Sequence, residues 1–242
     1  MSKRTKNQQR RIGVMKKSER GNGTQKEKNN IAKLFEDKNL GVKIDLGCGE
    51  NKQPGFIGVD FRKSPNVDIA QDITKFPWRD IPDDCASLVM ASHVLEHIPK
   101  HAPDPRLSGL LELLRTKGIV TDGEIDQYVG DHQFLSIFAR FMDEVWRILK
   151  PEGQFMAAFP YAGSHGFWQD PSHTSGLNET TFTYFDPLAK NPDGSLINLY
   201  TIYRSKPWKI VTVNYNMIGN MEILLEKRRI DPSYRVTTNN NI

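Results

Sequence analysis

The sequence has few cysteines and no long apolar segment. Only two of its 242 residues are cysteine, too few for a disulfide framework, so a reducing, cytoplasmic setting is expected. No apolar run reaches the length of a membrane span, so no membrane partner is expected. The basic N-terminal segment is not followed by the apolar stretch that a secretory signal requires. With 38% hydrophobic and 26% charged residues, the chain has the composition of one globular domain.

Positive charge is concentrated in residues 1–30. This segment holds ten Lys or Arg residues against two Glu, a net charge of +8, whereas the rest of the chain carries −4. It is rich in Asn, Gln, Ser and Gly and has too few apolar residues to form a core, which predicts a disordered basic tail. Such a tail is a solvated arm, a contact for nucleic acid or another polyanion, or a targeting signal.

Two glycines follow the first apolar run of the globular part. Residues 42–46 predict a strand, Gly47 and Gly49 come next, and a second apolar run ends at Asp60. Glycine has no Cβ, so the chain turns sharply there and a ligand lies directly on the backbone. The carboxyl ends of parallel strands form the ligand crevice of an open α/β sheet. The Asp60 carboxylate would accept hydrogen bonds from two ribose hydroxyls, so the pattern predicts a nucleoside site.

This pattern lacks two features of a dinucleotide site. The G-x-G-x-x-G fingerprint needs a third glycine and an acidic residue about 20 positions further on. Lys52 stands at the third glycine position, and Asp60 follows Gly47 by only 13 residues. The packing of a helix N-terminus against a pyrophosphate is therefore not encoded. S-adenosylmethionine, which has no phosphate, does not need it.

These residues resemble those of class I S-adenosylmethionine-dependent methyltransferases of type 11. The resemblance rests on Asp45-Leu46-Gly47-Cys48-Gly49 and Val59-Asp60, in the G-C-G-x-N-x-x-P-G-x-x-x-V-D spelling of one subset, and on L-K-P-x-G at residues 149–153. It implies an enzyme that binds S-adenosylmethionine. It also implies a Rossmann-like α/β fold, with a doubly wound, mostly parallel sheet and an antiparallel C-terminal hairpin. The residues implied to bind the cofactor are Asp45, Gly47, Cys48, Gly49, Asp60, Asp72, Ile73 and His93.

Two of these residues follow the third predicted strand. By the resemblance, Asp72 would bond the adenine amino group and the Ile73 amide a ring nitrogen. The alternative is that Asp72 only holds a turn at the strand end.

The domain is expected over residues 31–230, with a flexible C-terminus at 231–242. Ten residues between Leu46 and Ile57 are too few for an ordinary crossover helix, so the first helix should be one turn or absent. Leucines within residues 101–131 predict a helical insertion over the active-site face. The predicted helices are 30–40, 134–148 and 180–186, and the other predicted strands are 67–73, 86–92, 154–159, 197–203, 208–216 and 221–226.

The fourth strand leads into His93-Val94-Leu95-Glu96-His97. The H-x-x-E-H spelling also occurs in zinc proteases, and histidines four apart share one helix face. Methyltransferases that the chain resembles often carry a similar run here, so no metal is predicted. His93 is expected near the cofactor, and Glu96 and His97 are expected to make local structural bonds, with a role at the substrate as the alternative. A zinc hydrolase built on His93 and His97 stays an alternative.

The loop after the fifth strand should face the site. Asp170 and His173 lie in it and are the predicted catalytic residues, a base whose imidazole the aspartate orients. A well-bonded loop around Pro171, or a metal site of His165, Asp170 and His173, is the alternative. The predicted reaction transfers a methyl group to an oxygen or nitrogen. A non-catalytic S-adenosylmethionine-binding scaffold and a nucleic-acid-modifying methyltransferase that uses the basic tail also stay open.

Overall fold

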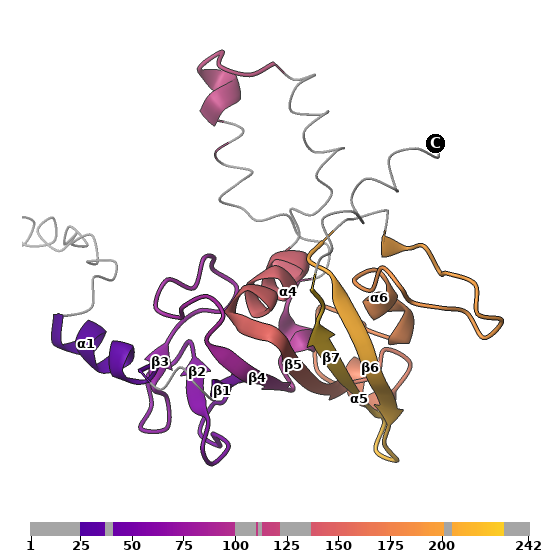
Figure 1. Ribbon diagram of the computed structural model, residues 1–242, viewed down its shortest axis with the longest axis horizontal. Coiled ribbons are helices and arrows are strands. Elements are labelled where there is room, and N and C mark those ends of the chain that lie inside the picture. The colour runs from indigo at the N-terminus through magenta and orange to yellow at the C-terminus, as the bar shows by residue number, and fades with distance from the viewer. Residues whose placement is uncertain are drawn as a thin grey trace, which may run out of the picture.

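The computed structural model describes residues 25–36, 41–99, 110, 113–121, 137–200 and 205–229. Seven strands form one sheet in the order β3-β2-β1-β4-β5-β7-β6, which runs from left to right in Figure 1. The five strands from β3 to β5 are parallel, and β7 pairs antiparallel with both β5 and β6. The strands are β1 (Val42–Leu46), β2 (Ile57–Asp60), β3 (Ile69–Ala70), β4 (Ala86–Ser92), β5 (Leu149–Pro160), β6 (Trp208–Tyr215) and β7 (Asn220–Lys227).

This arrangement confirms the predicted fold class. The sheet is mostly parallel and ends in an antiparallel C-terminal hairpin. Residues 47–56, which join β1 to β2, form turns and no helix, as their number predicts. In a parallel sheet all the carboxyl ends meet at one edge, so β3, β2, β1 and β4 bring their following loops together.

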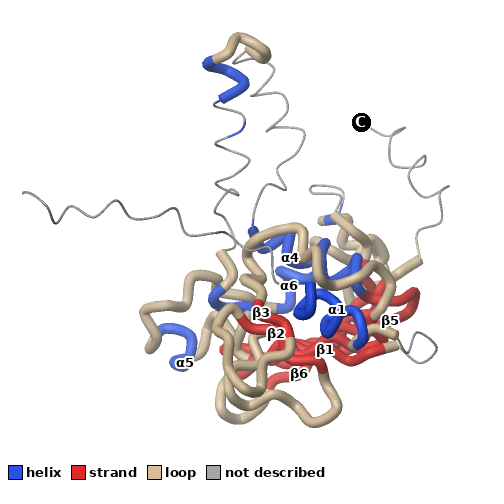
Figure 2. The backbone as a smooth tube through the Cα atoms, turned by 90° about the vertical axis from the view of Figure 1, so that its left-hand side faces the viewer, coloured by secondary structure: helices blue, strands red, loops and turns tan. Residues whose placement is uncertain are grey.

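Helices cover the sheet only in part, among the residues that the structure describes. They are α1 (Gln25–Lys33), the 3₁₀ turn η1 (Leu95–His97), α4 (Ile137–Ile148), α5 (His165–Trp168) and α6 (Glu179–Thr183). Helices α4 and α6 lie above the strands in the edge-on view of Figure 2. No helix in the described part of the chain is long and apolar enough to cross a membrane.

Aromatic side chains join α4 to the sheet. The ring of Phe141 meets that of Trp78 at 5.7 Å and that of Phe155 at 6.2 Å between centroids. Phe155 in turn contacts Trp208 of β6 at 6.0 Å. All four side chains are fully buried, and large aromatics contribute most to a core of this size.

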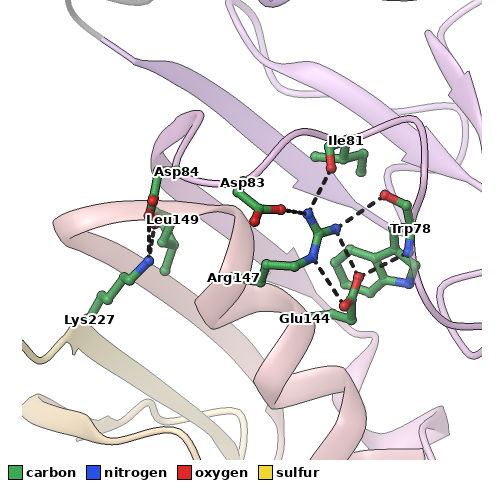
Figure 3. A network of polar contacts seen from close by, with 8 residues as sticks. All are labelled: Trp78, Ile81, Asp83, Asp84, Glu144, Arg147, Leu149 and Lys227. Atoms are coloured by element: carbon green, nitrogen blue, oxygen red, sulfur yellow. Dashed lines mark hydrogen bonds and ion pairs between the residues drawn. The ribbon is translucent and has the colours of Figure 1, made fainter. Parts of the chain in front are cut away.

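Arg147 fastens the end of α4 to the loop before β4 (Figure 3). Its guanidinium donates to the carbonyl oxygens of Ile81 and Trp78 at 3.0 and 3.2 Å. It also pairs with the carboxylates of Asp83 and Glu144 at 2.5 and 2.9 Å. One cation thus fixes the helix against the chain that enters the central strand.

A second cation, Lys227, fastens the end of β7 to the chain around the starts of β4 and β5 (Figure 3). Lys227 is buried and donates to Asp84 Oδ1 and to the carbonyl of Leu149, both at 2.6 Å. Together with Arg147, it holds the amino ends of β4 and β5 in place, opposite the edge where the ligand crevice forms.

Several predicted boundaries are wrong. The first helix spans Gln25–Lys33 and not residues 30–40, and the strand at 67–73 shrinks to Ile69–Ala70. The fifth strand is longer than 154–159, because residues 149–153 continue it across a register shift. Residues 197–200 form no strand, since Ile197 instead donates its amide to the carbonyl of Ala189. The other predicted strands and helices are present within about three residues of their expected ends, wherever those ends lie among the described residues.

Some predictions fall on residues that the structure does not describe. Residues 1–24 of the basic tail and 230–242 of the C-terminus lie outside the described ranges, as does most of the insertion at 101–131. Within the insertion, residues 113–116 are helical.

Candidate functional site

The predicted cofactor residues meet at the carboxyl edge of four neighbouring strands. Leu46, the last residue of β1, is paired with Val59 of β2 and with Ala91 of β4. The loops after these strands therefore start side by side. Behind β2, the amide of Gln71 donates to the carbonyl of Asp60 at 2.8 Å, which brings the chain after β3 to the same edge.

The glycine loop needs both of its glycines. Gly47 has φ +67° and Gly49 has φ +53°, a left-handed backbone that other residues adopt at a cost. A Cβ on Gly47 would lie 2.4 Å from Cγ2 of Val94, so the turn packs directly on the chain after β4. A Cβ on Gly49 would meet nothing within 4 Å. The backbone at Gly49 thus borders open space at the strand tips.

Asp60 closes this loop from the side of β2. Its Oδ2 accepts a hydrogen bond from the Gly49 amide at 3.1 Å, and its Oδ1 accepts one from the Arg62 amide at 2.9 Å. A carboxylate offers about four lone-pair sites, so two sites remain after these bonds. The side chain that sequence reasoning assigns to the ribose is therefore fixed in place and still able to accept.

Asp45 and Cys48 complete the floor of the loop. Asp45 is buried and accepts from the amide of Gln53 at 3.0 Å, and burial raises the pKa of its carboxyl. Burial, reinforced by Asp45 and Asp60, raises the pKa of the Cys48 thiol to about 11. Cys48 is therefore a neutral packing residue at physiological pH and not a nucleophile.

Asp72 has the bonding pattern of a turn residue. Its Oδ1 accepts from the amide and the hydroxyl of Thr74, at 3.0 and 2.6 Å, and its Oδ2 pairs with Lys75 at 2.8 Å. Partial burial alone would raise the pKa of the Asp72 carboxyl, but these bonds outweigh it and lower the pKa. Ile73 offers its carbonyl to the Trp78 indole at 3.2 Å. The adenine contacts of Asp72 and Ile73 stay predictions.

His93 marks the end of β4 with a left-handed backbone, φ +55°. Its Nε2 lies 3.3 Å from Asn220 Nδ2, and its Nδ1 lies 3.3 Å from Glu96 Oε1. The imidazole thus reaches toward β7 and toward Glu96. Its contact with the cofactor stays a prediction.

Glu96 makes hydrogen bonds through its backbone, while its side chain meets His93 Nδ1 at 3.3 Å without a hydrogen bond. The residue is 0% exposed, and neither carboxylate oxygen has a hydrogen-bond partner within the described chain. Its backbone carbonyl, in contrast, accepts from the amides of Thr174 and Ser175 at 2.8 and 3.0 Å. These two bonds tie the loop after β5 to the chain after β4. Burial raises the pKa of the Glu96 carboxyl.

His173 is held by a partner other than the one predicted. Its Nδ1 lies 2.8 Å from the carbonyl of Phe167, and the Phe167 ring stacks on the imidazole at 5.6 Å. The Nε2 atom lies 3.8 Å from Asp170 Oδ2 and 4.0 Å from Glu96 Oε1. The carbonyl of Phe167, and not Asp170, therefore sets the orientation of the ring.

Asp170 instead bonds within its own turn. Its Oδ1 accepts from the hydroxyl and the amide of Ser172 at 2.6 and 2.8 Å, and these bonds lower the pKa of the carboxyl. This agrees with the alternative of a well-bonded loop around Pro171. Trp168 in the same loop is 75% exposed and donates its indole N–H to the carbonyl of Ala162 at 3.1 Å.

Sequence reasoning gave Glu96 mainly a structural role and no part in a metal site. The signal was present in the H-x-x-E-H spelling, but a buried carboxylate far along the chain from His173 cannot be recognised without the fold. The pattern also gave no sign that Val94 packs on Gly47.

Comparisons with known proteins give structural neighbours only. No family model matches the chain, and no curated protein matches it significantly. Among solved structures, an S-adenosylmethionine-dependent methyltransferase from Archaeoglobus fulgidus is 17% identical, with 82% of this chain and 90% of that one covered and a TM-score of 0.41. A 16S rRNA adenine N1-methyltransferase variant from Catenulisporales acidiphilia is 12% identical, with 84% and 92% covered and a TM-score of 0.42.

A third neighbour is an S-adenosylmethionine-dependent methyltransferase from Mesorhizobium loti. It is 13% identical, with 81% of this chain and 95% of that one covered and a TM-score of 0.36. Because these TM-scores are under 0.5, the similarities support no conclusion about activity. Evidence on activity must come from the residues of this chain.

Proposed function

We propose that this chain is an S-adenosylmethionine-dependent methyltransferase. The observation that carries the proposal is the glycine loop itself, which leaves β1, bonds to the Asp60 carboxylate through the Gly49 amide and continues to β2 without a helix. The open space over Gly49 and the unused lone pairs of Asp60 suit a ribose. Asp45, Gly47, Cys48, Gly49 and Asp60 would hold the cofactor, with Asp72, Ile73 and His93 at its borders.

The charges at this edge favour a cationic nucleoside over a dinucleotide. Asp45, Asp60 and Glu96 are all at most 8% exposed. A pyrophosphate placed here would face carboxylates, and no helix N-terminus follows the glycine loop to offset its charge. S-adenosylmethionine carries a sulfonium and an ammonium group, which carboxylates attract.

The reaction would move a methyl group from the sulfonium to an oxygen or nitrogen of the acceptor. The leaving group is already activated, so the protein mainly aligns the two reactants and excludes water. The loop after β5 is tied to the chain after β4 through the Glu96 carbonyl, which places it beside the strand tips. We keep the prediction that His173, with Asp170 next to it, acts at the acceptor.

The test is to remove the Asp60 carboxylate and measure affinity for S-adenosylmethionine by calorimetry. A hydrogen bond to a charged group contributes about 1.5–3 kcal/mol, so Asp60→Ala should weaken binding by about 10- to 100-fold. Asp193→Ala is the matched control, because this exposed carboxylate bonds, among the described residues, to Ser195 in its own turn. Equal affinities of the Asp60→Ala and Asp193→Ala proteins would refute the ribose assignment.

A further inference from the structure

Three side chains from two loops converge beside the strand tips. Glu96 and His97 belong to the turn after β4, and His173 belongs to the loop after β5. One potential ligand atom from each lies within 4.8 Å of the others. The rings of His97 and His173 meet at 4.9 Å between centroids.

The carboxylate of this cluster has no hydrogen bond to offset its burial. Glu96 is completely buried, and both of its side-chain oxygens lack a hydrogen-bond partner among the described residues. An ionised carboxylate in that state costs several kcal/mol unless a cation lies next to it. The side chain is also aimed at the cluster, because its Oε1 is 4.0 Å from His173 Nε2. The same oxygen lies 3.3 Å from Nδ1 of His93, which is not part of the cluster.

Both histidines have their Nδ1 atoms engaged outside the cluster. The Nδ1 of His173 lies 2.8 Å from the carbonyl of Phe167, so it carries the proton. The Nδ1 of His97 lies 3.3 Å from the carbonyl and the hydroxyl oxygen of Ser172. That hydroxyl already donates to Asp170 at 2.6 Å, so it too accepts from His97.

The neutral tautomer that follows leaves each Nε2 with a free lone pair. A metal-ligating histidine almost always donates its other ring N–H to a carbonyl or carboxylate in this way. The loop after β5 thus orients both imidazoles, its own His173 and the His97 of the turn after β4, beside a buried carboxylate.

We propose that Glu96, His97 and His173 bind one divalent transition-metal ion of the Zn²⁺ and Co²⁺ class. These ions bind well to two imidazoles and a carboxylate, whereas Mg²⁺ and Ca²⁺ favour ligands that are all oxygen. Metal–ligand bonds of about 2.1 Å place the ligand atoms of a tetrahedral site about 3.4 Å apart, so the side chains must close by roughly 1 Å.

This site replaces both metal arrangements that the sequence left open, and it departs from the prediction of no metal. The pair His93 and His97 omits the buried carboxylate, and the set His165, Asp170 and His173 includes a carboxylate already bonded to Ser172. A metal on Nε2 of His173 would occupy the lone pair that a general base uses. The bound ion would then lower the pKa of an acceptor hydroxyl in its place.

The experiment is a Co²⁺ titration of the full chain after treatment with a chelator, without S-adenosylmethionine present. Visible absorption of Co²⁺ reports its ligands directly, and addition of Zn²⁺ should displace it. The result expected is one equivalent of bound metal per chain. Because no cofactor is used, failure here is separate from failure of the proposed methyltransferase function.

Three variants and one control identify the ligands. Glu96→Gln keeps the shape of a buried side chain, and His97→Gln changes an exposed residue, so both variants should fold. Each of these, and His173→Gln, should weaken Co²⁺ binding by about 100-fold or more. His165→Gln, an exposed histidine in the same loop, should bind as the wild-type protein does.

The proposal is overturned by any of three results. The first is a wild-type chain that does not bind one equivalent of Co²⁺ or Zn²⁺ even at a 100-fold excess of metal over protein. The second is a Glu96→Gln protein that binds Co²⁺ with the affinity of the wild-type protein. The third is that His165→Gln loses Co²⁺ binding while Glu96→Gln keeps it, which would assign the ion to His165, Asp170 and His173.

Discussion

A methyl group on Gly47 tests the contact that shapes the glycine loop. In Gly47→Ala, the new Cβ would lie 2.4 Å from Cγ2 of Val94, and the residue would keep a φ of +67°. A left-handed alanine costs about 1–2 kcal/mol, and overpacking against a buried side chain costs about 1–3 kcal/mol more. The total of about 2–5 kcal/mol should lower Tm by roughly 5–15 °C in a domain of this size.

The two contributions can be separated by urea unfolding of matched variants. Gly194→Ala has a φ of +85° and meets no atom within 4 Å, so it should show the backbone cost alone, about 1–2 kcal/mol. Val94→Ala removes the clashing methyl, so Gly47→Ala with Val94→Ala should show a favourable coupling of about 1–3 kcal/mol. If Gly47→Ala costs no more than Gly194→Ala, or the coupling is absent, the packing of Gly47 on Val94 is wrong.

Two further predictions concern the frame of the site. Arg147→Met should lower the free energy of unfolding by about 2 kcal/mol or more, because the carbonyls of Trp78 and Ile81 lose their charged donor. Arg229→Met, which removes a pair with both side chains exposed, should change it by less than about 0.5 kcal/mol, and equal losses would contradict the network. The Cys48 thiol, with a pKa raised to about 11 from 9.0, should be alkylated about 100-fold more slowly at pH 8 than an ordinary thiol. Its rate should rise about tenfold per pH unit up to pH 11, and mass spectrometry showing an ordinary thiol's rate at pH 8 would disprove the shift.

Local patterns made much of the fold predictable. The strand that ends at Leu46, the glycines that follow and the carboxylate at Asp60 are specified by residues next to one another in the sequence. The helix Ile137–Ile148 was equally visible, because its buried residues recur every three or four positions. The missing first helix followed from chain length alone, since residues 47–56 are too few for an ordinary crossover.

The errors occur where distant parts of the chain decide the structure. Residues 197–200 have strand-like composition, yet the backbone pairs locally, with Ile197 bonded to Ala189, and the sheet edge belongs to β6. The fifth strand extends back to Leu149 although Glu152 has a left-handed backbone, because the chain pairs with β4 on both sides of a register shift. Neither pairing can be read from a local pattern.

The acceptor side of the site was the least predictable part. Asp170 and His173 are three residues apart, which suggested a bonded pair. In the turn at Pro171, however, the carboxylate accepts from Ser172, and the imidazole bonds to the carbonyl of Phe167. The burial of Glu96 depends on two loops that only the sheet brings together. Hydrogen bonds within a turn compete with longer-range pairs, and the turn prevails here.

The most direct test of the central proposal is calorimetric titration of the full chain with S-adenosylmethionine and, separately, with NAD. The glycine loop without a following helix, beside the buried carboxylates of Asp45 and Asp60, predicts micromolar binding of the first ligand and none of the second. Binding of NAD, or of neither ligand, would contradict the account of this site as one for a cationic nucleoside.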